Sequence, residues 1–575
     1  MEDPFELVRR AADALRPDKI AAAVEQQIYT VRVLLGTGFA APVRPDKIAR
    51  AVWLLQRWSN TPAGAYSINA LTNPERDAVI DELGSLTFRE LHLRTNALAH
   101  ELSNAGIGPD QNVAVMCRNH RYFVEATVAL SKLGANTLYL NTAFAGPQIA
   151  EVVKREAASA VIYDSEFEGL VAAAKAGRAC YTAWESDSNS AQPTLKQLIE
   201  TGDRGDLDPP PAPGRVVILT SGTTGTPKGA ARSQPKNLDP AVALLSRIPL
   251  KARERALIAA PLFHSWGFAH FSLGLVLSST YVLQRHFDPE ATLAAVERYR
   301  PTVMAVVPVM LQRIMQLPEK VRRKYDTSSL RVVAVSGSAL PGELATSFMD
   351  EFGDILYNLY GSTEAAWASI ATPQDLRAAP GTAGVPPRGT VVRLFDDQNQ
   401  EVQPGGTGRI FVANEMLFDG YTSGGNKANI EGMLSTGDVG HIDANGRLFV
   451  EGRDDEMIVS GGENVFPAEV EDLLARHAGV AEAAVIGIPD KEFGQRLKAF
   501  VVRRPGSKLT DEQLKTYVKS NLARYKVPRE VEFMDELPRN STGKVVKRKL
   551  APPAHKGNGA KPAARSSKRA SQKTR

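Results

Sequence analysis

Strand-like and helix-like segments alternate along most of this chain, and this alternation restricts the folds open to it. Between residues 86 and 450, short runs rich in β-branched residues are separated by helical patterns. The clearest runs are residues 113–116, 216–220, 257–260, 303–307 and 332–335. Asp288 and Pro289 indicate the start of one helix, because Asp caps a helix and Pro is favoured at its first position. The alternation predicts an α/β domain of mostly parallel sheets with flanking helices.

The chain is long enough to require more than one domain. Its 575 residues exceed what one hydrophobic core usually supports. After Arg453 the pattern changes to a shorter α+β segment, in which Thr510 and Gln513 form a capping box. We therefore expect four parts: a helical extension (1–60), a large domain (61–452), a small C-terminal α+β domain (453–550) and a disordered basic tail (551–575).

Charge and cysteine content exclude several classes of protein. The formal net charge is +5, but residues 551–575 carry seven Lys or Arg and no acid, so the rest of the chain is slightly acidic. This distribution predicts no specific nucleic-acid partner. Cys117 and Cys180 are too few for a disulfide framework or a cysteine metal site, which favours a reducing cytoplasm. The acidic amino end and the lack of a run of about 20 apolar residues argue against a signal peptide and a membrane span.

A short motif is repeated in the N-terminal extension. The sequence Arg-Pro-Asp-Lys-Ile-Ala occurs at residues 16–21 and again at 44–49, and each copy opens an amphipathic stretch that we expect to be helical. The second stretch mixes Trp53 and Trp58 with Leu and Arg, which is compatible with weak contact with a membrane surface. Two helices packed on the main domain are the favoured interpretation.

A polar loop follows the apolar run at residues 216–219. Residues 220–229 read Thr-Ser-Gly-Thr-Thr-Gly-Thr-Pro-Lys-Gly, with five hydroxyls, three glycines and one lysine. Glycine lets backbone amides approach phosphate oxygens, hydroxyls donate to them, and lysine neutralises their charge. The loop is not the P-loop of P-loop NTPases, since counting from Gly222 puts Pro227 where the second glycine belongs. The sequence predicts a polyphosphate site here.

Four further motifs follow in order. They are Tyr360-Gly361-Ser362-Thr363-Glu364, Ser435-Thr436-Gly437-Asp438, Gly452-Arg453-Asp454-Asp455 and Pro538-Arg539-Asn540-Ser541-Thr542-Gly543-Lys544. With these motifs the chain resembles the acyl-adenylate-forming (ANL) superfamily, which includes acyl-CoA synthetases, peptide-synthetase adenylation domains and luciferases. The resemblance extends from about residue 86 to residue 550 and is strongest to fatty-acyl-CoA synthetases.

The resemblance implies a role for each motif. Residues implied to hold ATP phosphates are Thr220, Ser221, Gly222, Thr223, Thr224, Gly225 and Lys228. Residues implied to line the nucleoside and acyl pocket are Ser336, Gly337, Ser338, Tyr360, Gly361 and Ser362, with Asp438 and Arg453 on the ribose. Glu364 would bind Mg²⁺, a hard cation that prefers carboxylate oxygen, with Thr363 beside the α-phosphate. His264 would lie near the acyl and pantetheine channel.

The resemblance also implies a small C-terminal domain that moves. Lys544 would bridge the substrate carboxylate and the α-phosphate during adenylation, a role that suits a mobile point charge. Gly461 and Gly462 would lie along the pantetheine of CoA in the second step. Asp455 matches the hinge position about which the domain would turn between the two steps.

We interpret the chain as a fatty-acyl-CoA synthetase. It would use ATP, Mg²⁺ and CoA to convert a fatty acid through acyl-AMP into acyl-CoA. An aryl-CoA ligase, an acyl-AMP ligase that loads a carrier protein, and a non-catalytic nucleotide-dependent binding protein stay open as alternatives. A homodimer also stays open, and the expected location is the cytoplasm with weak peripheral contact with the membrane.

Overall fold

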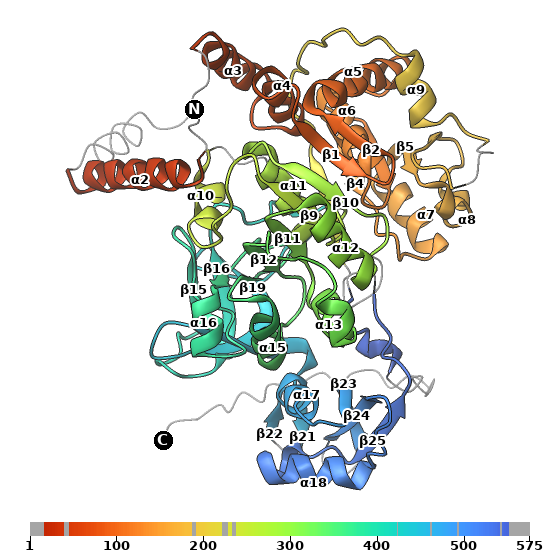
Figure 1. Cartoon of the computed structure of the whole chain (residues 1–575). Coiled ribbons are helices and arrows are strands. Elements are labelled where there is room, and N and C mark those ends of the chain that lie inside the picture. Colours follow the sequence, from red (N-terminus) through yellow and green to blue (C-terminus); the bar gives the residue numbers. More distant parts are fainter. Residues whose placement is uncertain are drawn as a thin grey trace, which may run out of the picture.

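The computed structural model describes residues 17–38, 45–186, 191–220, 228–232, 237–422, 424–460, 463–490, 494–540 and 543–550 (Figure 1). Four sheets organise this part of the chain. Its cysteines, Cys117 and Cys180, are free and buried, as their small number predicted. Within these ranges, no helix combines the length and the apolar character needed to cross a membrane.

The largest sheet is eight-stranded and mostly parallel. Its order is β14 (Ser369–Ala371), β13 (Leu356–Tyr360), β12 (Val332–Val335), β11 (Val303–Val306), β9 (Arg255–Ile258), β10 (Thr280–Leu283), β1 (Asp77–Asp81) and β2 (Gly84–Thr87). Only its two outermost pairs, β13–β14 and β1–β2, are antiparallel. Burial on both faces explains the continuous apolar sequences of these strands.

A seven-stranded sheet stands beside the first. Its order is β17 (Gly420–Tyr421), β8 (Lys228–Arg232), β7 (Val216–Thr220), β4 (Asn136–Tyr139), β3 (Asn112–Met116), β5 (Ala158–Tyr163) and β6 (Ala179–Thr182). The strands from β7 to β6 are parallel, whereas β17, β8 and β7 pair antiparallel. The parallel α/β architecture expected from the alternation is thus confirmed.

Helices cover and connect these two sheets. They are α4 (Pro62–Thr72), α5 (Phe88–Asn104), α6 (Arg121–Leu133), α7 (Gly146–Arg155), α8 (Glu168–Val171), α9 (Leu195–Thr201), α10 (Asp239–Leu245), α11 (Ser265–Val276), α12 (Pro289–Tyr299), α13 (Pro308–Gln316), α14 (Glu319–Arg322), α15 (Gly342–Phe352) and α16 (Pro373–Ala378). Helix α12 begins as predicted, with the Asp288 side chain accepting a 2.7 Å hydrogen bond from the Ala291 amide.

Helix α11 lies between the cores of the two sheets. Its Phe271 packs in the core that includes β3, whereas its Trp266 packs in the core that includes β11 and β12. A helix with apolar residues on nearly all sides suits such a position. Its location decides where the substrate cavity described below can extend.

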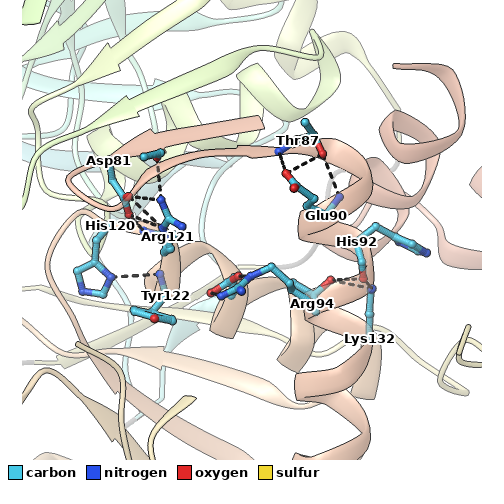
Figure 2. Close-up of polar contacts among 12 residues, drawn as sticks. Asp81, Thr87, Glu90, His92, Arg94, His120, Arg121, Tyr122 and Lys132 are labelled. Carbon is cyan, nitrogen blue, oxygen red and sulfur yellow. Dashed lines mark hydrogen bonds and ion pairs between the residues drawn. The ribbon is translucent and has the colours of Figure 1, made fainter. Parts of the chain in front are cut away.

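Buried polar contacts join α5 and α6 to strand β1 (Figure 2). Arg121 of α6 donates to Asp81 at the end of β1, with both Nε–carboxylate distances 3.0 Å. Lys132 of α6 donates to the His92 carbonyl and the Thr95 hydroxyl of α5, at 3.1 and 2.8 Å. Burial lowers the pKa of Lys132 to about 7. These contacts satisfy charges that would be costly to bury alone.

Two smaller sheets follow along the chain. The third is antiparallel and contains β15 (Val391–Phe395), β16 (Gly408–Ala413), β19 (Met433–Ile442), β18 (Asn429–Ile430) and β20 (Leu448–Arg453). The fourth contains β22 (Glu463–Val465), β21 (Ile458–Ser460), β24 (Gly494–Arg503), β23 (Val480–Asp490) and β25 (Glu530–Met534), with helices α17 (Pro467–Ala475) and α18 (Asp511–Asn521). The predicted capping box of Thr510 and Gln513 opens α18. The antiparallel third sheet was not separated from the α/β region by sequence.

The N-terminal extension forms two helices, as the repeated motif predicted. Helix α2 (Pro17–Gly36) lies beside α10, and α3 (Pro45–Trp58) leads into α4 (Figure 1). The tail at residues 551–575 lies outside the described residues, so its predicted disorder stays a prediction. The exact domain boundaries also stay predictions.

Candidate active site

A cavity of about 1990 Å³ opens at the carboxyl ends of β12 and β13. Loops at this end of a parallel sheet are where α/β proteins place their ligands. The cavity is lined by Ser336, Gly337 and Ser338 after β12 and by the motif that follows Tyr360 after β13. It continues along α11 and reaches the loop that carries Lys544. Most of the motifs singled out in the sequence therefore meet at one place.

The strands that flank the predicted phosphate loop form a hairpin. Strands β7 and β8 pair antiparallel, with Thr220 opposite Lys228. Lys228 lies 5.0 Å from the ring of Tyr421, over its face, and lines the cavity. The predicted residues Ser221, Gly222, Thr223, Thr224 and Gly225 lie outside the described residues, and their roles stay predictions.

Glu364 lies buried in the cavity wall. The Tyr421 hydroxyl donates to its Oε1 at 2.7 Å. The neighbouring Thr363 hydroxyl hydrogen-bonds the hydroxyl of Ser265, the first residue of α11, at 2.9 Å. Because one carboxylate oxygen accepts from Tyr421, the second can serve as an oxygen ligand, which fits the Mg²⁺ role implied for Glu364.

Arg232 is a functional candidate that the sequence analysis missed. It lies on β8 and donates from Nη2 to the Thr363 carbonyl at 2.6 Å. Burial lowers the pKa of Arg232 to about 10, while the charges of Glu364 and Asp419 oppose that shift. A buried guanidinium beside this carboxylate holds the Thr363–Glu364 segment in place. Arg232 lies outside the phosphate-loop pattern, so no motif points to it. Only the pairing of β8 with β7 and β17 places it in the cavity wall.

We expect Arg232→Met to lower acid-dependent ATP–pyrophosphate exchange by roughly 10- to 100-fold, the usual cost of losing a charged hydrogen bond. Because Arg232 positions Glu364, the KM for MgATP should rise more than kcat falls. Arg232→Lys should restore part of the rate. Arg215→Met changes an exposed arginine just before β7 and serves as the matched control. Equal loss in both methionine variants would contradict a positioning role.

Tyr360, Asp438 and Arg453 form one polar group. Tyr360 donates to Asp438 Oδ2 at 2.5 Å, and Arg453 Nη1 lies 3.5 Å from Asp438 Oδ1. Asp438 and Arg453 face each other on the paired strands β19 and β20. Burial raises the pKa of Asp438, and the nearby charges of Lys544 and Lys427 counteract this rise. Lys427, which also lines the cavity, is a second residue that the motifs did not indicate.

Gly361 is required by a close backbone approach. A Cβ atom at this position would lie 2.0 Å from the Ala366 carbonyl oxygen. The next residue, Ser362, accepts a 3.0 Å hydrogen bond from the Ala365 amide, which closes the turn. This tight turn directs Thr363 and Glu364 toward the cavity, so the glycine and serine of the motif have a structural reason.

His264 precedes α11 and lines the cavity. Asn141 Nδ2 donates to His264 Nε2 at 3.2 Å, which places the proton of the neutral imidazole on Nδ1. Burial lowers the pKa of His264 to about 4. The ring is therefore neutral near pH 7 and suits shaping of the acyl channel better than carrying charge.

Lys544 reaches the cavity from the C-terminal part of the chain. Its amide donates to Asn540 Oδ1 at 2.8 Å, and its exposed side chain lies near enough to Asp438 to affect that carboxylate. Asp455 lies in a short 3₁₀ turn, Asp454–Glu456, directly after β20. Gly461 and Gly462 fall outside the described residues, between the paired strands β21 and β22.

One other cluster has the residue types of a metal site. Cys117, His120 and Asp164 are fully buried, with their polar atoms within 4.8 Å of one another. His120 Nδ1 accepts from the Tyr122 amide at 3.1 Å, so Nε2 carries the proton and donates to Asp164 at 2.8 Å. Both ring nitrogens are thus used, and the cluster fits a hydrogen-bonded core better than a metal ion.

Comparison with known proteins supports this cavity as the candidate active site. The family described as "AMP-binding enzyme" matches residues 67–422, and its C-terminal domain matches residues 469–544. The chain belongs to the AMP-binding enzyme family. Among curated relatives, a feruloyl-CoA synthase of Amycolatopsis sp. is 35% identical over 500 residues, covering 85% of this chain and 98% of the relative. An indoleacetate–CoA ligase of Aromatoleum aromaticum is 33% identical, with coverages of 86% and 96%.

Solved structures show the same fold. ATP-bound MatB from Rhodopseudomonas palustris has a TM-score of 0.76 at 26% identity, over 85% of this chain and 98% of that one. The ANL resemblance inferred from five short motifs is thereby confirmed, as is a large mixed α/β part followed by a smaller C-terminal one. The family match also makes the chain an adenylate-forming ligase.

Proposed function

We propose that this protein is an ATP-dependent CoA ligase for a large hydrophobic carboxylic acid. In the first step, a carboxylate oxygen attacks the α-phosphorus of MgATP, giving acyl-AMP and pyrophosphate. In the second, the thiol of CoA attacks the acyl carbon, its proton is lost, and AMP leaves with the bonding electrons. Adenylation is needed because a free carboxylate lacks a good leaving group.

The cavity supplies a group for each requirement of the first step. Lys544 supplies a mobile cation for the charge that develops between the carboxylate and the α-phosphate. Glu364 would hold Mg²⁺ against the phosphates, a group that neutralises charge when bound. Asp438, held between Tyr360 and Arg453, offers an acceptor for ribose hydroxyls. These roles are part of the proposal.

The length of the cavity supports a large acyl group. It follows α11 from His264 to Val276, and the 12 residues of this helix span about 18 Å. Residues of α11 that line it are Ser265, Trp266, Gly267, Phe268, Ala269, Ser272, Leu273, Leu275 and Val276. Since all but two are apolar or glycine, this wall favours a long apolar chain, and a fatty acid is our first candidate substrate.

A ring-bearing acid is the second candidate. Similar relatives carry names for feruloyl and indoleacetate substrates, both aromatic acids. In this chain, Trp266, Phe268 and Trp367 line the cavity. Aromatic side chains there can stack on a substrate ring.

A panel of acids separates the two candidates. Pyrophosphate release is measured with straight-chain acids of eight to sixteen carbons and with benzoate-, phenylpropenoate- and indoleacetate-type acids. Each buried methylene contributes about 0.8 kcal/mol, so two added carbons should raise kcat/KM by roughly tenfold until the cavity ends. If a ring-bearing acid exceeds every straight-chain acid, the fatty-acid assignment is wrong.

The same assay tests the acceptor. With CoA present, AMP and a thioester should accumulate together; with CoA absent, acyl-AMP should stay bound and turnover should stop. Acyl transfer to a carrier protein but not to CoA would identify a carrier-loading ligase instead. Absence of pyrophosphate release with every acid would favour the non-catalytic binding protein. A cytoplasmic location and a homodimer stay predictions.

A further inference from the structure

Exposed large apolar side chains concentrate on the N-terminal extension. Among the described residues, eleven such side chains are exposed, and seven of them lie on α2 and α3. The seven are Ile28, Val31, Leu35, Ile48, Val52, Trp53 and Leu55, each between 48% and 58% exposed. Contiguous exposed apolar residues on a folded protein mark a contact with another apolar surface.

Helix α2 has two different faces. On one face, Gln26 and Thr30 lie within hydrogen-bonding distance of Asp239 on α10, and Val33 packs against the large core. On the opposite face, Ile28, Val31 and Leu35 recur at i, i+3 and i+7 and point away from that core. The docked face fixes the helix, so its apolar stripe is presented to the outside.

Helix α3 adds a second apolar stripe and carries an excess of cations. Ile48, Val52 and Leu55 recur at i, i+4 and i+7, and all are about half exposed. Three cations, Lys47, Arg50 and Arg57, accompany one acid on this helix. Arg57 stacks 4.7 Å from the ring of Trp53 and also pairs with Asp208 at 2.8 Å. An amphipathic helix that carries apolar residues, a tryptophan and an excess of Lys and Arg matches the chemistry of an anionic bilayer surface.

The extension also lies at the distant end of the substrate cavity. Beyond α11, the cavity is lined by Asn60, Thr61 and Pro62, where α3 passes into α4, and by Pro240 and Ala241 of α10. Helix α2 packs on this same α10 (Figure 1). Helices α2 and α3 therefore lie near the end of the cavity that is remote from Lys544.

We propose that the exposed faces of α2 and α3 form a docking surface for an anionic lipid bilayer. Their apolar stripes enter the interface, while Lys47 and Arg50 contact headgroup phosphates. This docking does not depend on the proposed function. Where that function holds as well, docking places the cavity end at the surface in which a hydrophobic carboxylic acid partitions.

A bilayer fits this surface better than a second copy of the chain. In a two-fold dimer, each face meets its own copy, so the cations of α3 would be brought near identical cations. Anionic headgroups instead provide the opposite charge. The pairing of stripe and cations thus favours lipid.

Vesicle cosedimentation of the full-length protein tests the proposal. Vesicles of phosphatidylcholine with phosphatidylglycerol are compared with pure phosphatidylcholine. The triple variant Ile48→Gln/Val52→Gln/Leu55→Gln should bind the anionic vesicles at least roughly tenfold more weakly, since it loses three apolar side chains that the bilayer would bury. Lys47→Glu/Arg50→Glu should weaken binding to anionic vesicles and leave binding to neutral ones unchanged.

Control variants separate docking from folding and from charge elsewhere. Leu83→Gln/Val391→Gln changes two exposed apolar residues outside the extension and should bind like the wild type. The basic tail is present in every variant, so differences arise from the extension. Circular dichroism and pyrophosphate exchange with a short, water-soluble acid should be unchanged in the α3 variants.

Three results would overturn the proposal: no binding of the wild type to anionic vesicles, equal binding of the wild type and the α3 triple variant, or equal loss in the control variant. Light scattering can give a fourth result that would overturn the proposal. A wild-type dimer that becomes a monomer in the triple variant, without vesicle binding, would assign the surface to a second copy. Vesicle binding without ligase activity would support the docking surface and refute the proposed function.

Discussion

Replacing Lys544 with alanine is expected to lower acid-dependent ATP–pyrophosphate exchange by roughly 100- to 1,000-fold, the usual cost of removing one preorganised charge from a transition state. Conversion of supplied acyl-AMP and CoA to thioester should persist. In the structure, Lys544 lines the cavity near Asp438, the arrangement that the first step needs. The two half-reactions are measured separately on each variant.

The matched controls for Lys544 are its neighbours. Arg548 and Lys549 are exposed cations of the same C-terminal segment, and Arg548→Ala/Lys549→Ala should retain both half-reactions. Gly462→Leu should show the opposite defect to Lys544→Ala, forming acyl-AMP and failing at thiol transfer. Equal loss of both half-reactions in Lys544→Ala and Gly462→Leu, with circular dichroism unchanged, would refute a C-terminal domain that works in two orientations.

Gly543→Ala should also impair adenylation selectively, because this residue contacts the large domain. Gly543 has φ +78°, and a Cβ atom there would lie 2.1 Å from Cγ1 of Val309 on α13. The clash with Val309 is present only in the adenylation orientation, and overpacking costs about 1–3 kcal/mol, so pyrophosphate exchange should fall by roughly 10- to 100-fold. Thioester formation from acyl-AMP should change less, since the second orientation would remove Gly543 from Val309.

Two variants make this result specific. Gly506→Ala introduces the same backbone strain at φ +80° in the C-terminal part, where no atom lies within 4 Å of the added Cβ, and should leave adenylation nearly unchanged. Val309→Ala, combined with Gly543→Ala, removes the clash and should recover part of the exchange rate. Failure of this rescue, with Val309→Ala alone active, would show that contact with α13 does not limit adenylation.

Local sequence patterns predicted the architecture well. The runs at 216–220 and 332–335 are β7 and β12 as expected, and the strand predicted at 257–260 is β9, which begins two residues earlier. A parallel strand buried on both faces is an apolar run, so its sequence identifies it. The antiparallel strands after residue 390 mix polar and apolar residues and so carry weaker signals, which is why the third sheet was missed.

The motif residues could also be found from sequence, because each short motif combines residue types that meet demanding local chemistry. Gly361 illustrates this, since its turn leaves no space for a side chain. Arg232 shows the limit of that approach. It lies within a strand, with no motif around it, and its contact with the Thr363 carbonyl joins residues 131 positions apart. Lys427 lies outside the strands, just before β18, and was missed because none of the motifs includes its position.

The sequence by itself therefore determined the family, the α/β class and the order of the candidate site residues, because strand composition and loop chemistry are local properties. The tertiary structure decided which motifs meet in the cavity, how far that cavity follows α11, and that Arg232 lies beside Glu364. It also decided the orientation of α2. Ile28 and Val33 are equally apolar in sequence, and only the packing of Val33 against the core leaves Ile28 on the outside. Side-chain periodicity defines the faces of a helix, whereas long-range packing determines which face is buried.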